Sequence, residues 1–173
     1  MVSNSHRIVF CCDMEELLHP DFARAVETLS ESFAALLSME PTGGGRLPAT
    51  VPTQGVYLFS ENGVHLYVGR SNGIRNRYGR HCNPCATHRT AAFAFKLARE
   101  ATGKLRASYR SDHESRSGLM LDPVFAEVFR TSKVRIRAME FRAVEECDPT
   151  RQALLEIYCA VALSTRYNDF DTH

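Results

Sequence analysis

The stretch GVYLFSENGVHLYVGRS, residues 55–71, decides the fold. Two runs rich in β-branched and aromatic residues flank Asn62-Gly63, a dipeptide that strongly favours a tight turn between antiparallel strands. The stretch therefore predicts a β-hairpin with one tyrosine in each strand, Tyr57 and Tyr67. Paired tyrosines on strands are more often packing residues than catalytic ones, so their direction matters.

Two turn lengths compete, because a shift of one residue turns every side chain of a strand to the other face. A two-residue Asn62-Gly63 loop pairs Leu58 with Tyr67, whereas a three-residue loop that includes Glu61 pairs Tyr57 with Tyr67. We favour the three-residue loop, because it alone separates an apolar face from an aromatic one. The apolar face then carries Val56, Leu58, Val64, Leu66 and Val68, and the other face carries Tyr57, Phe59, His65 and Tyr67.

The rest of the chain predicts helices around a small sheet. Apolar residues at helical spacing cover residues 14–38, with Pro20 opening the longer helix, and a loop rich in glycine and proline follows. After the hairpin we expect a short helix capped by Ser71 or Asn72, and then a helix at about 87–102. A short helix from Pro123, a strand within 133–145 and a helix opened by Asp148-Pro149 should follow. The fold class is thus α+β: a small antiparallel or mixed sheet, made of the hairpin plus a third strand, flanked by helices.

The length of 173 residues and the apolar fraction of 44% fit a compact globular chain. We divide it into residues 1–52, an N-terminal helical extension with a linker, and residues 53–173, the main domain. The main domain includes a basic helical insertion at about 82–132.

Charge is distributed unevenly along a chain whose formal net charge is +1. Residues 1–46 hold three arginines against seven acids, a net of −4, and residues 70–116 hold eleven basic residues against three acids, a net of +8. A basic middle indicates a face for a polyanion such as DNA, although a solvated helical surface has the same composition.

The six cysteines are scattered, which is typical of reduced thiols rather than of a disulfide framework. No apolar run is long enough to span a membrane, and the start lacks the features of a signal peptide. We therefore expect a cytoplasmic protein without a membrane partner.

The hairpin motifs Gly55-Val56-Tyr57 and Tyr67-Val68-Gly69 resemble the two-part signature of the GIY-YIG nucleases. Arg77, ten residues after Tyr67, stands where that family carries its essential arginine. His81 follows one helical turn later, where some members carry histidine and others tyrosine.

Two late residues extend the resemblance, which covers about residues 53–170. Glu156 resembles the single acidic metal ligand of the family, and Asn168 resembles an asparagine found behind it in several members. Glu156 also stands out by itself, because it lies between Leu155 and Ile157 in an apolar helix, and a buried acid needs a metal or a cation nearby. The spacing is similar to that of restriction endonucleases of this family.

The resemblance implies a metal-dependent DNA endonuclease that leaves 5′-phosphate ends, and the restriction-like spacing implies a homodimer. The implied cofactor is Mg²⁺, with Mn²⁺ as a substitute. Tyr57 would be the general base, or pass the proton on, which requires a cation or a hydrogen-bond network to favour its phenolate. The other implied roles are phosphate binding by Arg77, orientation or relay by His81, contact with water or phosphate by Tyr67, metal binding by Glu156 and support by Asn168.

Six basic residues are candidates for contacts with the DNA backbone: Arg70, Arg75, Arg80, Arg89, Lys96 and Arg99. The alternative function is a DNA-binding or zinc-containing module that keeps the fold without cleaving. The segment HCNPCATH offers His81, Cys82, Cys85 and His88 as zinc ligands. We do not favour structural zinc, because such sites usually draw a second ligand pair from farther along the chain.

Overall fold

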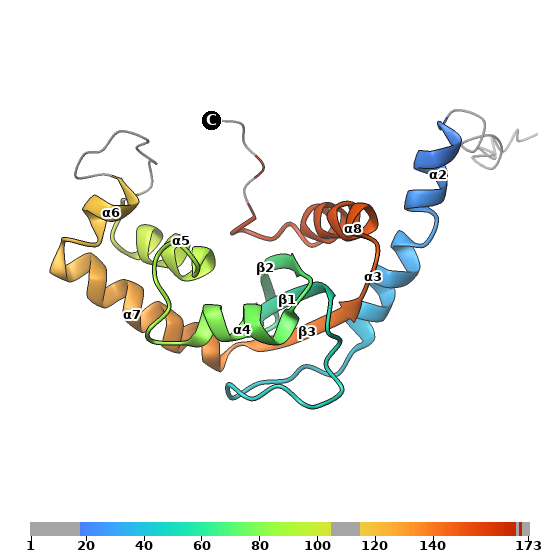
Figure 1. Cartoon of the computed structure of the whole chain (residues 1–173). Coiled ribbons are helices and arrows are strands. Elements are labelled where there is room, and N and C mark those ends of the chain that lie inside the picture. Colours follow the sequence, from blue (N-terminus) through green and yellow to red (C-terminus); the bar gives the residue numbers. More distant parts are fainter. Residues whose placement is uncertain (1–17, 105–114, 169, 171–173) are drawn as a thin grey trace, which may run out of the picture.

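The computed structural model describes residues 18–104, 115–168 and 170 (Figure 1). An antiparallel three-stranded sheet in the order β2-β1-β3 lies at its centre. The strands are β1 (Gly55–Glu61), β2 (Val64–Ser71) and β3 (Glu140–Glu145). This arrangement confirms the α+β class and the hairpin joined by a third strand.

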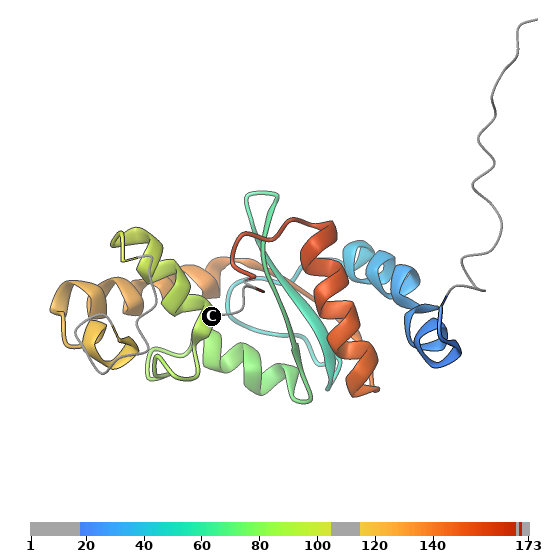
Figure 2. The ribbon, with the colours of Figure 1, turned by 90° about the horizontal axis from the view of Figure 1, so that it is seen from above.

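Seven helices surround the sheet within these residues. They are α2 (Pro20–Val26), α3 (Leu29–Ser38), α4 (Ile74–Cys82), α5 (Ala92–Ala101), α6 (Arg116–Leu119), α7 (Pro123–Ala138) and α8 (Pro149–Ala162). Seen from above, α8 lies on one side of the hairpin, and α4 and α5 lie on the other (Figure 2). None of the helices in the described ranges is long and apolar enough to cross a membrane.

The two faces of the sheet carry separate apolar clusters. One face buries Tyr57, Phe59 and Tyr67 against residues of α4, α5 and α7. The other face buries Val56, Leu58 and Val68 against residues of α3 and α8. Both faces of the sheet are therefore interior. The aromatic face also buries a polar side chain, His81, which packs against Phe59.

The hairpin turn is a two-residue loop, so the predicted three-residue loop is wrong. Glu61 pairs with Val64. Asn62 and Gly63 both have positive φ, 52° and 76°, which is the backbone of a turn whose twist matches the flanking strands. Ser60 then pairs with His65, and the register shifts between Ser60 and Phe59.

This register shift is a β-bulge, and because of it Tyr57 and Tyr67 lie on the same face of the hairpin. Leu66 has no partner on β1, so Phe59 pairs with Tyr67. Tyr57 lies opposite Gly69 and is therefore a diagonal rather than a direct neighbour of Tyr67. The face of Tyr57, Phe59 and Tyr67 is as predicted. The predicted places of three β2 residues are wrong: Val64 is exposed, His65 pairs with Ser60, and Leu66 packs with the tyrosines.

Helix α7 runs to Ala138, so the first half of the strand predicted at 133–145 is helical. Its buried residues are Phe125, Phe129, Ser132, Lys133 and Ile136, a stripe at helical spacing. The alternation of apolar residues at 134, 136 and 138 suggested a strand, but Val134 is exposed on the outer face of the helix. Asp122 and Pro123 open α7 as predicted, because the Asp122 carboxylate accepts hydrogen bonds from the first turn.

The N-terminal helices α2 and α3 are separated at Glu27–Thr28 instead of forming one long helix, and residues 14–17 of the predicted helix lie outside the described residues. Leu36 of α3 belongs to the aliphatic cluster, and Leu47 of the following loop belongs to the aromatic one. The extension therefore contributes to both cores. Thr42 also bonds to Phe141 in both directions and covers the outer edge of β3.

Candidate active site

Three polar side chains from β1 and α4 form one hydrogen-bonded group. Tyr57 Oη lies 3.0 Å from His81 Nε2, and Arg77 Nε donates to Tyr57 Oη at 3.1 Å. Arg77 and His81 are four residues apart, so they project from the same face of α4. Because a guanidinium can only donate, the Tyr57 oxygen accepts from Arg77 and directs its own O–H to His81.

Aromatic rings hold this group in place. The Tyr57 and Tyr67 ring centroids are 6.4 Å apart, and Tyr67 stacks on Phe93 at 4.7 Å. Opposite Tyr57, Gly69 leaves the space that the phenol fills, since a Cβ there would lie 2.3 Å from Tyr57 Oη. Gly69 of the second motif therefore leaves the space that Tyr57 of the first motif needs.

His81 is a neutral imidazole in this environment. It is completely buried, and burial together with the nearby Arg77 charge lowers its pKa to about 3. Its Nδ1 has no hydrogen-bond partner among the described residues. His81 can therefore accept the Tyr57 proton at Nε2 but carries no charge in the free protein at neutral pH.

The neutral state of His81 makes stability depend on pH. Its folded pKa lies below its unfolded pKa of about 6.5, so its contribution is complete above about pH 6.5 and is lost as the pH falls toward 3. We expect the free energy of unfolding to fall by about 2 kcal/mol between pH 7 and pH 5 from this residue. Urea unfolding at both pH values should show a smaller fall for His81→Gln, which keeps a hydrogen-bond acceptor but does not titrate. Equal pH dependence in the two proteins would contradict the assignment.

Burial also controls Tyr57, whose side chain is 1% exposed. Desolvation, the neighbouring Tyr67 and the negative charge of Glu156 raise the pKa of Tyr57, and Arg77 lowers it by less. Arg77 thus acts in the expected direction, but burial outweighs it. Tyr57 is consequently a neutral phenol in the free protein.

Glu156 lies on α8, the helix that covers the opposite face of the sheet from the tyrosines. Burial is the main cause that raises the pKa of Tyr57 and of Tyr67, and the negative charge of Glu156 adds to both shifts. Among the described residues no hydrogen bond or ion pair joins Glu156 to Tyr57, Tyr67 or Arg77.

The Glu156 carboxylate is paired with Arg70, which follows the second motif on β2. Arg70 Nε donates to Glu156 Oε2 at 3.0 Å, and the Glu156 side chain is 24% exposed. Burial raises the pKa of Glu156, while Arg70 and Arg77 oppose the shift. Arg70, predicted to contact DNA, is therefore bound to the predicted metal ligand in the free protein.

Asn168 supports the edge strand and is not directed at the tyrosines. Its Nδ2 donates to the Val68 carbonyl at 2.9 Å, and its Oδ1 accepts from the Val68 N–H at 2.8 Å. The amide thus continues the sheet by one residue and fixes β2 between its two motif residues, Tyr67 and Gly69. A supporting role fits these contacts, whereas a direct phosphate contact would have to break them.

The other predicted DNA contacts differ in what they bind. Arg75 donates to the carbonyls of Leu47 and Pro48, Lys96 donates to the Tyr167 carbonyl, and Arg99 donates to the Lys104 carbonyl. Arg80 and Arg89 are exposed, and neither has a hydrogen bond or ion pair to another described residue. Arg80 and Arg89 are thus the two whose guanidinium groups are unengaged.

The candidate zinc segment does not assemble into a metal site. Nowhere in the described ranges do three or more His, Cys, Asp or Glu residues gather closely enough to hold a metal ion. His81 is bound to Tyr57, Cys82 is buried beside Tyr78, and Cys85 is exposed. Lys133 instead holds this loop, by donating to the carbonyls of Pro84 and Ala86.

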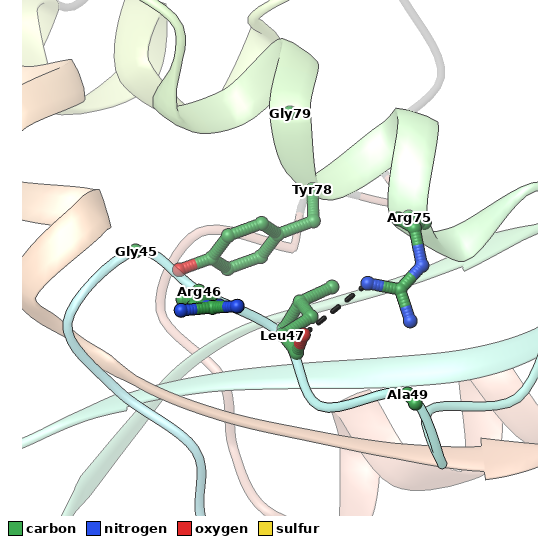
Figure 3. Close-up of a pocket in the computed structure, with 7 residues that line it drawn as sticks. All are labelled: Gly45, Arg46, Leu47, Ala49, Arg75, Tyr78 and Gly79. Atoms are coloured by element: carbon green, nitrogen blue, oxygen red, sulfur yellow. Dashed lines mark hydrogen bonds between the residues drawn. The ribbon is translucent and has the colours of Figure 1, made fainter.

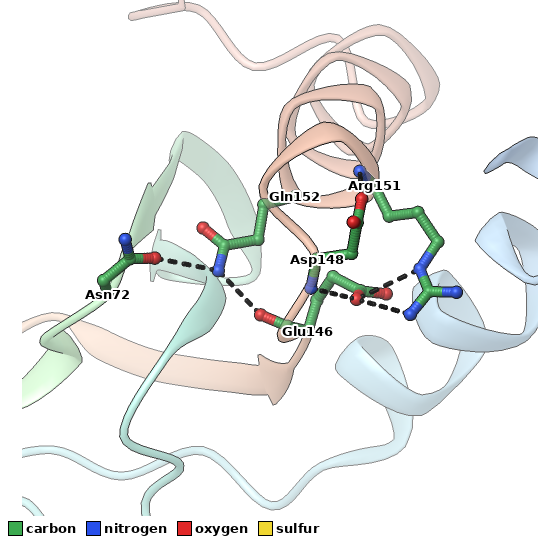
Figure 4. A network of polar contacts seen from close by, with 5 residues as sticks. All are labelled: Asn72, Glu146, Asp148, Arg151 and Gln152. Atoms are coloured by element: carbon green, nitrogen blue, oxygen red, sulfur yellow. Dashed lines mark hydrogen bonds and ion pairs between the residues drawn. The ribbon is translucent and has the colours of Figure 1, made fainter.

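A buried polar network at the start of α8 was missed from the sequence (Figure 4). Gln152 Nε2 donates to Asn72 Oδ1 at 3.1 Å and to the Glu146 carbonyl at 2.7 Å. The Glu146 carboxylate accepts from Arg151 Nε at 3.1 Å. The network joins α8 to the end of β3 and to the turn before α4, one helical turn from Glu156. A buried polar residue in an apolar helix was the signal that could have found Gln152.

Comparisons of this chain with protein-family models, curated proteins and solved structures give no match. Within the structure, Tyr57, Tyr67, Arg77 and His81 lie together. Glu156 is paired with Arg70 on β2, and Asn168 bonds to the same strand at Val68.

Proposed function

We propose that this protein is a metal-dependent DNA endonuclease that hydrolyses phosphodiester bonds. The observation that carries the proposal is the hydrogen-bonded group of Tyr57, Arg77 and His81 from β1 and α4, with a carboxylate, Glu156 of α8, whose charge acts on Tyr57. Phosphodiester hydrolysis uses a proton acceptor, a cation for the phosphoryl oxygens and a carboxylate for a metal ion. The resemblance of the hairpin motifs to GIY-YIG nucleases supports the same reaction.

Arg77 binds the scissile phosphate in this proposal. It uses its Nε–H for Tyr57 and one Nη1–H for the Thr90 carbonyl at 3.4 Å. Three of its five N–H groups remain for phosphoryl oxygens. The contact with Tyr57 fixes the guanidinium before the substrate arrives, which is the condition for efficient stabilisation of developing charge.

Tyr57 and His81 move the proton. The water oxygen attacks phosphorus, the bond from phosphorus to the 3′ oxygen breaks, and that oxygen takes a proton from solvent. The proton lost by the water passes to the Tyr57 oxygen as Tyr57 O–H is transferred to His81 Nε2, along the hydrogen bond of 3.0 Å. Burial is the main cause of the low His81 pKa and the Arg77 charge adds to it. A phosphate anion would offset only the Arg77 part, and to that extent substrate binding would make His81 a better acceptor.

Glu156 fits the requirements of a magnesium ligand. Mg²⁺ is commonly bound by one or two carboxylates together with waters and substrate phosphates, and Glu156 is a partly exposed carboxylate whose partner in the free protein is Arg70. When bound, the ion supplies a Lewis acid for the phosphoryl oxygens. Arg70 must leave Glu156 for this, and its guanidinium then faces the incoming DNA backbone.

A DNA-binding module that does not cleave is the second candidate. It is favoured by the state of the free site, in which Glu156 is paired with Arg70 and Tyr57 is a buried, neutral phenol. Such a protein would bind duplex DNA equally well with Mg²⁺ or EDTA and leave the DNA intact. A homodimer, which a restriction-like enzyme needs to cut both strands, stays a prediction.

Plasmid cleavage tests the proposed function. We expect the protein to convert supercoiled plasmid into nicked or linear DNA with Mg²⁺ or Mn²⁺ and not with EDTA. Tyr57→Phe, which keeps the buried ring but removes the proton relay, should be slower by about 10²-fold. Arg24→Ala, on the exposed surface of α2, is the control and should cleave normally. Intact supercoiled DNA across several divalent metals would overturn the proposal.

A further inference from the structure

A second feature of α4 lies on the side away from the tyrosines. A hollow of about 560 Å³ is lined by Gly45, Arg46, Leu47, Ala49, Arg75, Tyr78 and Gly79 (Figure 3). A neighbouring hollow of about 460 Å³ shares Arg75 and Gly79 with it and adds Arg80. The two hollows form one groove along the exposed face of α4, and Gly79 keeps its floor open, since a Cβ there would meet no atom within 4 Å.

The groove is positively charged. Arg46, Arg75 and Arg80 line it, and Arg137 lies against Gly45 at one end. Within the part of the chain that the structure describes, none of these four arginines forms an ion pair with an acid. Arg75 is fixed by the Leu47 and Pro48 carbonyls, which leaves its other N–H groups for a ligand. Four unneutralised arginines make this groove a site for an anion.

Tyr78 forms a fixed wall of the groove. Its side chain is 5% exposed, and its hydroxyl ends beside Gly45 and Arg46 (Figure 3). The hydroxyl oxygen is itself buried near the Gly45 backbone and the Cys82 thiol, so a ligand in the groove does not reach it. The ring is stacked on Phe59, and the charge that a ligand would meet is therefore that of the arginines.

We propose that this groove is a second phosphate-binding site, which holds the sugar–phosphate backbone of a nucleic acid across the outer face of α4. The choice of ligand rests on the proposed function. Arg77 and His81 face the tyrosines from the same helix whose other face carries Arg75 and Arg80. The groove therefore holds the DNA backbone on the face of α4 opposite the tyrosines, and it does not touch the reacting phosphate.

Binding of a fluorescent DNA duplex in EDTA tests this inference without requiring cleavage. We expect Arg46→Ala to weaken binding about tenfold and to lower the slope of log affinity against log salt by about 1, as for the loss of one phosphate contact. Arg24→Ala, whose arginine lies on α2, is the matched control and should bind as the parent protein does.

Arg80→Ala separates ligand binding from folding at the other end of the groove. Arg80 is exposed and makes no hydrogen bond to another described residue, so the melting temperature should stay unchanged, whereas DNA affinity should fall about threefold or more. Parent-like DNA affinity in both Arg46→Ala and Arg80→Ala would overturn the inference. So would calorimetric binding of inorganic phosphate that Arg46→Ala abolishes while DNA affinity stays intact, since the groove would then serve free phosphate. A protein that binds DNA through Arg46 but never cuts it would overturn only the proposed function.

Discussion

Glu156→Gln should lower the rate of DNA cleavage by about 10³-fold at saturating Mg²⁺, while DNA affinity in EDTA stays the same or increases. Glutamine keeps the size of the side chain but removes the negative charge that a divalent cation requires. Glu156 is paired with Arg70, and it is the one acid whose charge acts on both tyrosines among the described residues. Loss of that acid would remove the proposed metal ligand and would also free Arg70 for the DNA backbone.

Glu145→Gln is the matched control, because Glu145 is an exposed acid at the end of β3. It should cleave and bind as the parent protein does. Titration of Mg²⁺ distinguishes the role of Glu156 further: the variant should need far more metal for any residual activity. Normal cleavage by Glu156→Gln at low Mg²⁺ would show that the metal ligand lies elsewhere or that no metal is involved.

The sequence predicted the sheet and its aromatic face, but not the way that face is made. Asn62-Gly63 correctly predicted the position of the turn. The choice of a loop that made one face of the hairpin entirely apolar, however, predicted a loop one residue longer than the observed one. The β-bulge at Leu66 corrects the register inside the strand instead. A bulge of a non-glycine residue has no sequence signature, so this part of the hairpin required three-dimensional information.

The candidate site, like the hairpin, could be predicted only in part from the sequence. Glu156 and Gln152 both break the apolar pattern of α8, and that pattern identifies them as functional or structural polar residues. The sequence does not show that α8 packs on the aliphatic face of the sheet, where Glu156 pairs with Arg70 of β2. It also does not show that burial outweighs Arg77 in setting the Tyr57 pKa, because desolvation depends on every ring packed around the phenol.

Gly69→Ala should destabilise the protein by about 3 kcal/mol and abolish cleavage, although it adds only one methyl group. The new Cβ would lie 2.3 Å from Tyr57 Oη and 2.4 Å from Cζ. The Tyr57 ring cannot easily retreat, because Phe59, Phe141 and His81 surround it. The change therefore either moves the hydroxyl away from Arg77 or shifts β2, and both outcomes separate the tyrosine from its hydrogen-bond partners.

Two further variants show whether the clash is the cause. Gly79→Ala adds the same methyl group in α4, where a Cβ meets no atom within 4 Å, and should stabilise the protein by about 1 kcal/mol through helix propensity. In a Tyr57→Leu background, which lacks the clashing ring atoms, Gly69→Ala should cost less than about 1 kcal/mol. Urea unfolding of the parent protein, Gly69→Ala, Tyr57→Leu and the double variant gives this coupling directly. An equal cost of Gly69→Ala in both backgrounds would mean that the glycine serves the β2 backbone and not the tyrosine, and the link between the two hairpin motifs would fail.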